Sequence, residues 1–156
     1  MFPIKNVKAH CDIPCKIYDP VLAQIAALSV IRLLDLIAET KGTEYSLESE
    51  ATIARLVFEK EEQARIVKHE INIIWGDYFK APQIEMCPTI HETVHEIMQT
   101  GSKCKQEVDS ENGIKLLGLV NNFASMFWKT KEVSTRLVVA PYPPALGFIQ
   151  PNLSDA

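Results

Sequence analysis

The sequence predicts an all-α protein: an antiparallel four-helix bundle with an N-terminal metal-binding hook and an irregular C-terminal tail. Apolar residues recur at helical spacing in four separate stretches of the chain. Loops of short or moderate length, marked by glycine, proline or polar residues, separate these stretches, which favours antiparallel neighbours. We find no internal repeat, and no strong strand pattern before Leu137.

The composition is that of an ordinary globular chain. The 156 residues are 47% hydrophobic and 23% charged, which suits one domain with a packed core. A net charge of -4 argues against a nucleic-acid partner, and no apolar run is expected to reach the length of a membrane span. Four cysteines without a secretory signal favour a reducing compartment, so we expect a cytoplasmic protein.

The first predicted helix begins at Asp19 and Pro20, because aspartate is a good N-cap and proline is favoured in the first turn. Lys41 and Gly42 end it. Apolar residues cover most of its circumference, so we expect it to be covered on two sides, the second by a neighbouring subunit.

The second predicted helix begins at Ser46, an N-cap residue, and continues for over twenty residues to Gly76, a natural stop. Lys60 falls close to its apolar face. We expect the Lys60 side chain either to extend to solvent or to pair with Glu61 or Glu62.

An irregular connector is expected from Asp77 to Cys87, because prolines interrupt it and follow it. The third predicted helix begins at Thr89, which with Glu92 fits a capping box, and runs to about Gln99. Gly101 is expected to close it.

A polar loop is predicted at 102–112, and nothing in the sequence suggests a role for Cys104 within it. The fourth helix begins near Asp109 and reaches Trp128. The segment 138–144 is apolar but broken by prolines, so it cannot continue the helix. We expect it to lie across a partner subunit or to be loosely ordered.

The stretch from His10 to Pro20 places two thiols and an imidazole ahead of the first helix. In a chain beginning at His10, the His10 α-amine, the Cys11 amide nitrogen and both thiolates would form an N2S2 square, with Pro14 providing the turn that returns Cys15. Square-planar nitrogen and sulfur ligation favours Ni(II) or Cu(II) over tetrahedral zinc, and the His10 imidazole could bind axially. This requires a processing protease to remove the pro-segment 1–9. The alternatives are a Cys11–Cys15 disulfide or two unremarkable thiols in a flexible leader.

Three separated motifs resemble those of the nickel-containing superoxide dismutase family. They are His10-Cys11-Asp12-x-Pro14-Cys15-x-x-Tyr18-Asp19-Pro20, Trp75-x-Asp77-Tyr78-Phe79-Lys80-x-Pro82 and Phe127-Trp128-x-Thr130-Lys131. The resemblance covers about residues 10–132, which we take as one unit of hook and bundle, leaving 133–156 as a proline-rich C-terminal extension.

The resemblance implies an enzyme that converts superoxide to dioxygen and hydrogen peroxide at a centre alternating between Ni(III) and Ni(II), with two protons consumed. The implied ligands of the nickel ion are His10, Cys11 and Cys15. The residues implied to shape the substrate mouth are Asp12, Tyr18, Tyr78 and Lys80. The proton source stays open among water, a coordinated thiol and the two tyrosine hydroxyls, and the family forms homohexamers.

The chain departs from the family at three positions. Lys16 stands where the family usually has glycine, and Ala26 and Gln63 replace a glutamate and an arginine that orient the axial imidazole in some members. An anionic substrate approaching a net-negative protein needs local positive charge, for which Lys16 and Lys80 are the candidates. Tyr18 and Tyr78 could instead be core aromatics, and Trp75 and Trp128 are expected in the core.

Two rival functions remain. His91-Glu92-x-x-His95 matches the zinc-hydrolase pattern in which both imidazoles share one helix face, with Cys87 and Glu111 as further ligand candidates. A solvated helix face is the more common origin of such a short pattern. The other rival is a non-enzymatic helical bundle whose hook is vestigial or only stores metal.

Overall fold

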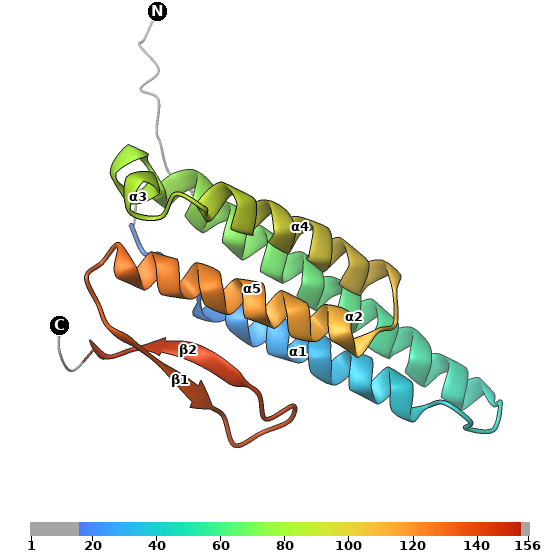
Figure 1. Ribbon diagram of the computed structural model, residues 1–156. Helices are drawn as coiled ribbons and strands as arrows, with labels where there is room; N and C mark the ends of the chain where they lie inside the picture. Colours follow the sequence, from blue (N-terminus) through green and yellow to red (C-terminus); the bar gives the residue numbers. More distant parts are fainter. Residues whose placement is uncertain (1–15, 154–156) are drawn as a thin grey trace, which may run out of the picture.

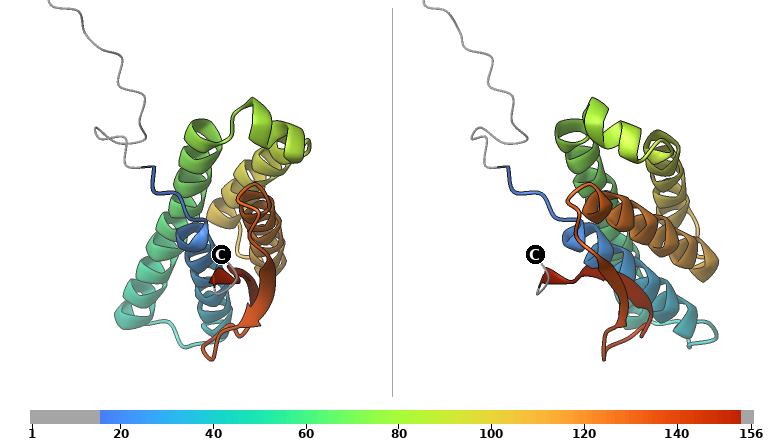
Figure 2. Two further views of the ribbon diagram at one scale, coloured as in Figure 1. Left: turned by 90° about the vertical axis from the view of Figure 1, so that its left-hand side faces the viewer. Right: turned by 60° about the vertical axis from the view of Figure 1, so that its left-hand side comes forward.

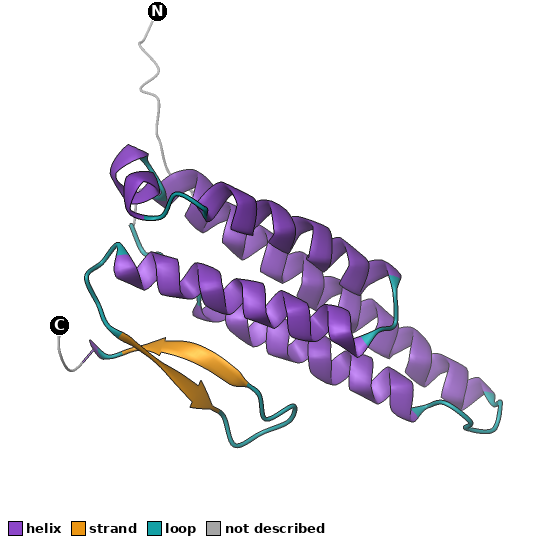
Figure 3. Ribbon diagram, in the orientation of Figure 1, coloured by secondary structure: helices purple, strands orange, loops and turns teal. Residues whose placement is uncertain are grey.

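The computed structural model describes residues 16–153 (Figure 1). The helices are α1 (Val21–Glu39), α2 (Leu47–Ile73), the π-helical turn η1 (Ile74–Tyr78), α3 (Ala81–Met86), α4 (Ile90–Gln106) and α5 (Ser110–Lys129). The strands are β1 (Thr135–Val139) and β2 (Gly147–Pro151). The prediction of a mostly helical protein is therefore confirmed, whereas the small sheet was not expected (Figure 3).

Four long helices surround the core. Helix α1 packs against α2 and α5, and α4 packs against the same two helices from the other side (Figure 2). Successive long helices run in opposite directions. Apolar side chains from all four meet in one buried cluster, whose largest members include Leu34, Ile71, Ile97, Phe123 and Phe127. Burial of this cluster is the main source of stability.

Helix α1 is the most apolar element. An Asp19 carboxylate oxygen accepts a hydrogen bond from the Val21 amide at 2.8 Å, as the predicted cap requires. The expectation that no apolar run reaches membrane length was wrong, because Val21–Glu39 is 19 residues long with a mean hydropathy of 2.0. Half of this stretch is buried within the protein, and the central helix of a packed bundle meets the same criteria.

Helix α2 begins as predicted and ends later. The Ser46 hydroxyl accepts a hydrogen bond from the Ser49 amide at 3.1 Å, and the Ser49 hydroxyl accepts one from the Ser46 amide at 2.9 Å. The predicted stop at Gly76 was wrong, because the helical path continues through η1 to Tyr78. A glycine ends a helix by taking a left-handed conformation, and among the described glycines only Gly42 has a positive φ, of 85°.

Helix α4 differs from the prediction at both ends. The Thr89 side chain makes no cap hydrogen bond, so the expected capping box is absent. The helix also passes Gly101 and continues to Gln106. A Cβ atom on Gly101 would lie 3.1 Å from the Lys68 Cγ atom, so this glycine allows α4 to approach α2 closely. The predicted polar loop is consequently shorter, and Cys104 is fully buried.

Lys60 neither reaches solvent nor pairs with an acid, contrary to the prediction. Its side chain is 1% exposed, and its ammonium donates hydrogen bonds to the carbonyls of Lys105 at 2.8 Å and Glu107 at 3.1 Å. These carbonyls lie at the end of α4, where a cation is favoured by the helix dipole. Burial lowers the pKa of Lys60, and the nearby Glu61 charge partly opposes that shift.

The connector predicted at 77–87 as irregular contains helix α3. The Lys80 amide donates to the Gln83 side chain at 3.1 Å, and Pro82 lies in the first turn, where its missing N–H costs no hydrogen bond. A capping side chain and an early proline are therefore enough to start one short helix here.

The C-terminal segment is not irregular, because β1 and β2 form an antiparallel hairpin in which Val138 pairs with Phe148. The hairpin lies along α1 and α5 (Figure 1). Gln24 of α1 is 1% exposed, and its amide donates to the Ile149 carbonyl at 2.9 Å and to the Asn121 side chain at 3.1 Å. The Ile149 amide donates to the same Asn121 oxygen at 3.1 Å. A buried polar network thus joins the hairpin to both helices.

The buried thiol of Cys104 gives stability a pH dependence. Burial raises its pKa from 9.0 to about 11, so its contribution to stability is complete below pH 9 and is lost as the pH rises through about 11. We expect the free energy of urea unfolding to fall by up to about 3 kcal/mol more over this range in the wild type than in Cys104→Ala. Equal losses in both proteins would contradict the assignment. Cys87→Ala provides a matched control for removing a second buried thiol.

Candidate metal and redox site

The predicted hook residues His10, Cys11, Asp12 and Cys15 lie outside the described residues. The predicted site residues that the structure does describe are Tyr18, Tyr78 and Lys80. The described surroundings of the hook therefore begin at Lys16, which precedes α1.

Tyr18 and Tyr78 lie side by side although sixty residues separate them in the chain. Their ring centroids are 5.7 Å apart, with a tilt of 47° between the planes. The Tyr78 ring also packs against the buried rings of Phe79 and Phe127, with distances between ring centroids of 5.4 Å and 5.0 Å. Both tyrosines are half-buried, so they form a partly accessible aromatic edge to the core. We call this pair the tyrosine pair.

The end of α5 completes the surroundings of Tyr78. The Tyr78 hydroxyl oxygen lies 2.7 Å from the Thr130 hydroxyl oxygen, and the Thr130 hydroxyl donates to the Phe127 carbonyl at 2.7 Å. The Lys131 ammonium lies 4.4 Å from the centroid of the Tyr78 ring, within the range of a cation–π interaction. The sequence motif contained Thr130 and Lys131, but only the fold shows that both contact Tyr78.

Lys16 and Lys80, the candidates for attracting an anionic substrate, are each two residues from a member of the tyrosine pair in the sequence. The Lys80 ammonium donates to the Gly76 carbonyl at 2.8 Å, which holds its charge beside η1. Lys16 has a φ of 59°, the left-handed region that glycine enters freely and other residues enter at a cost of roughly 1–2 kcal/mol. Lys16 therefore adopts a backbone conformation that would suit the glycine usual at this position in the family.

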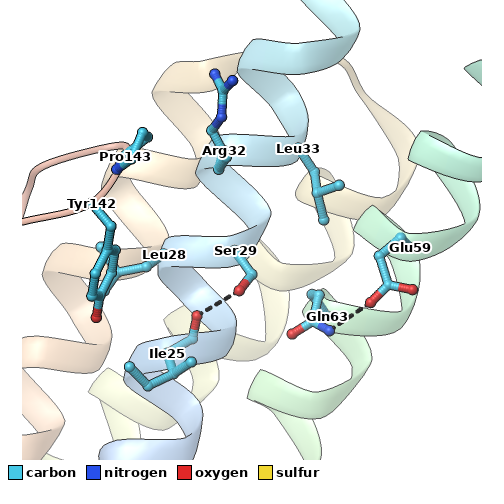
Figure 4. Close-up of a pocket in the computed structure, with 9 residues that line it drawn as sticks. All are labelled: Ile25, Leu28, Ser29, Arg32, Leu33, Glu59, Gln63, Tyr142 and Pro143. Atoms are coloured by element: carbon cyan, nitrogen blue, oxygen red, sulfur yellow. Dashed lines mark hydrogen bonds between the residues drawn. The ribbon is translucent and has the colours of Figure 1, made fainter.

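The other two departures lie on α1 and α2. Ala26 is buried in the core, and the Gln63 amide donates to the Glu59 carboxylate at 2.8 Å. Gln63 lines a cavity of about 360 Å³ between α1, α2 and the hairpin loop, into which Tyr142 projects (Figure 4). None of the described site residues lines this cavity, so it is separate from the tyrosine pair.

The zinc alternative receives no support from the geometry. The Trp75 indole N–H donates to the Nδ1 atom of His91 at 3.0 Å, so this nitrogen is already occupied as an acceptor. Trp75 and Trp128, which were expected in the core, are half-buried and pack against it, and Trp75 also makes this polar contact. His95 is exposed, with its Nε2 atom 3.4 Å from the Gln99 amide nitrogen. Within residues 16–153, no three histidine, cysteine or acidic side chains gather as metal ligands.

In the sequence, a segment with two cysteines and a histidine, residue types that bind transition metals, comes directly before Tyr18 and the helical scaffold, which is typical of a metal-dependent protein. The chain belongs to the nickel-containing superoxide dismutase family, whose sequence model matches residues 5–131. Strands β1 and β2 follow the matched residues.

Relatives and solved structures agree with this assignment. The chain is 35% identical over 130 residues to superoxide dismutase [Ni] of Streptomyces seoulensis, which covers 83% of this chain and 94% of the relative. It is 34% identical to the same enzyme of Streptomyces coelicolor, with equal coverage. A crystal structure of a Ni-containing superoxide dismutase with oxidized-state nickel ligation has a TM-score of 0.69 and 34% identity, covering 79% of this chain and 99% of that chain.

Mutation of His95 separates the two metal assignments. We expect His95→Ala to keep the wild-type nickel content and superoxide turnover, because this exposed side chain lies on a helix face without partner ligands. Metal analysis and a superoxide-decay assay on the nickel-loaded protein test this. Zinc that copurifies with the wild type and disappears in His95→Ala would contradict it.

Proposed function

We propose that the chain, after removal of residues 1–9, holds nickel through His10, Cys11 and Cys15 and dismutates superoxide to dioxygen and hydrogen peroxide. One observation carries the proposal. Tyr18 of the first motif and Thr130 of the third both contact Tyr78 of the second. Three motifs spread over more than one hundred residues therefore meet at one place, next in the chain to the hook.

The donor set of the hook suits nickel. Two thiolates, an amine and a backbone amide are the ligands that favour square-planar Ni(II). Bound nickel would supply an electron carrier that alternates between the divalent and trivalent states. The amine exists only when His10 is the first residue, so trimming of the leader is a condition of binding.

The chain's own residues would surround the reacting atoms. Tyr18 and Tyr78 would place two phenol side chains near the reacting atoms, and the buried Phe79 and Phe127 hold the Tyr78 ring in place. Lys80 and Lys131 add positive charge that attracts an anionic substrate. The four long helices act in this proposal as an antiparallel bundle that supports the hook at one end.

Trimming provides the direct test. We expect a chain that begins at His10 to bind one nickel ion and to accelerate superoxide decay, because its free amine completes the donor square. A chain that begins at Ala9 is the matched control, since one added residue turns this amine into an amide. Both are made by site-specific cleavage of a fusion and compared by metal analysis, nickel absorption spectrum and turnover. Equal nickel binding and equal turnover would refute the proposal.

We further propose that the chain assembles into a homo-oligomer, as expected for the family. Leu47 is 80% exposed and Phe58 is 71% exposed. Eleven residues, about three helical turns, separate them on α2, so both lie on one face. Val21, Leu22 and Ile25 leave a second apolar surface on α1. Exposed apolar surfaces of this kind mark protein interfaces.

Charges on the α2 face should weaken the assembly. We expect Leu47→Glu with Phe58→Glu to lower the molar mass measured by size-exclusion chromatography with light scattering, while the helical circular dichroism stays unchanged. Val108→Glu is the control, because Val108 is a comparably exposed apolar residue in the loop between α4 and α5. A monomeric wild type, or a double variant with the wild-type mass, would disprove this interface.

A further inference from the structure

The Tyr78 hydroxyl is one end of a short hydrogen-bond chain. Its oxygen lies 2.7 Å from the Thr130 Oγ1 atom, which in turn lies 2.7 Å from the Phe127 carbonyl oxygen. Phe127 is in the last turn of α5, and its carbonyl also accepts a hydrogen bond from the Thr130 amide at 3.1 Å. Its second lone pair remains for the hydroxyl of the same threonine, which lies three residues further along the chain.

The number of hydroxyl protons determines which group donates in each of these two hydrogen bonds. A carbonyl oxygen can only accept, so the single Thr130 hydroxyl proton points to Phe127. Thr130 then has only lone pairs to offer to Tyr78. The Tyr78 O–H must therefore donate to Thr130, and the phenol oxygen presents lone pairs on its remaining side.

We infer that Thr130 is a positioning residue that keeps Tyr78 a hydrogen-bond acceptor toward the reacting molecules. This inference rests on the proposed function. In this orientation Tyr78 can accept a hydrogen bond from water or from hydrogen peroxide, both of which carry O–H groups. It cannot donate to the superoxide anion unless Thr130 releases the Phe127 carbonyl. The protons consumed in the reaction therefore come from a group other than the Tyr78 hydroxyl.

The orientation has further support at the Tyr78 ring. Phe79, Phe127 and Tyr18 contact the ring, and the Lys131 ammonium lies over it. These contacts restrict the ring, so that its hydroxyl stays within reach of Thr130. The residue after Thr130 thus helps to place the same tyrosine.

Two variants of Thr130 test the inference. Thr130→Val keeps the side-chain shape and removes the hydroxyl, whereas Thr130→Ser keeps the hydroxyl. The first readout is solvent exchange of the Tyr78 hydroxyl proton, measured by carbon-13 NMR of protein labelled at the tyrosine ζ carbon, with Tyr78→Phe to assign the signal. We expect exchange about five- to tenfold faster in Thr130→Val, and wild-type exchange in Thr130→Ser.

This measurement uses the full-length chain without nickel, so its result does not depend on dismutase activity. The second readout is superoxide turnover of nickel-loaded protein beginning at His10. We expect Thr130→Val to lose about fivefold in turnover at wild-type nickel content, and Thr130→Ser to restore it. Unchanged hydroxyl exchange in Thr130→Val would overturn the hydrogen-bond direction. Altered exchange with unchanged turnover would overturn the positioning role.

Discussion

Covering helix α1 is the constraint on which the rest of the structure depends. Its apolar residues occupy most of the helix circumference, and leaving them in water would cost roughly 25 cal/mol for each Å². Helices α2 and α5 cover two sides, and the C-terminal hairpin adds cover through the network around Gln24. Because residues 16–20 lead directly into α1, the packing of this helix also fixes the position of Tyr18 at its start.

The sequence predicted those parts of the fold that local signals control. Helical spacing identified all four long helices, and Ser46 and Asp109 cap theirs as expected. The predictions were wrong where contacts with residues distant in the sequence determine the local structure. Gly101 serves the close approach of Lys68 and does not stop α4. The hairpin depends on side chains of α1 and α5, of which Gln24 looks like an ordinary polar residue in the sequence.

For the candidate site too, the sequence predicted individual residues but not the contacts between them. The motifs pointed to Tyr18, Tyr78 and Lys80 one by one. That Tyr78 donates to Thr130 follows only when residues 52 positions apart are brought together, and this orientation answers part of the proton question that the sequence left open. The Trp75 indole N–H likewise binds the Nδ1 atom of His91, and no third ligand joins His91 and His95, so the metal-like pattern in the sequence has no ligand geometry among the described residues.

Charge near the tyrosine pair completes the argument. The two ion pairs within the described residues are Arg32–Glu39 and Arg65–Glu62, so neither Lys80 nor Lys131 is neutralised by a described acid. The Lys80 ammonium binds a carbonyl, and the Lys131 ammonium lies over a ring; both partners are neutral. Neither ammonium is therefore paired with a described acid, while its position is restricted. In a protein with a net charge of -4, these fixed positive charges create a local attraction for an anion that the overall charge would repel.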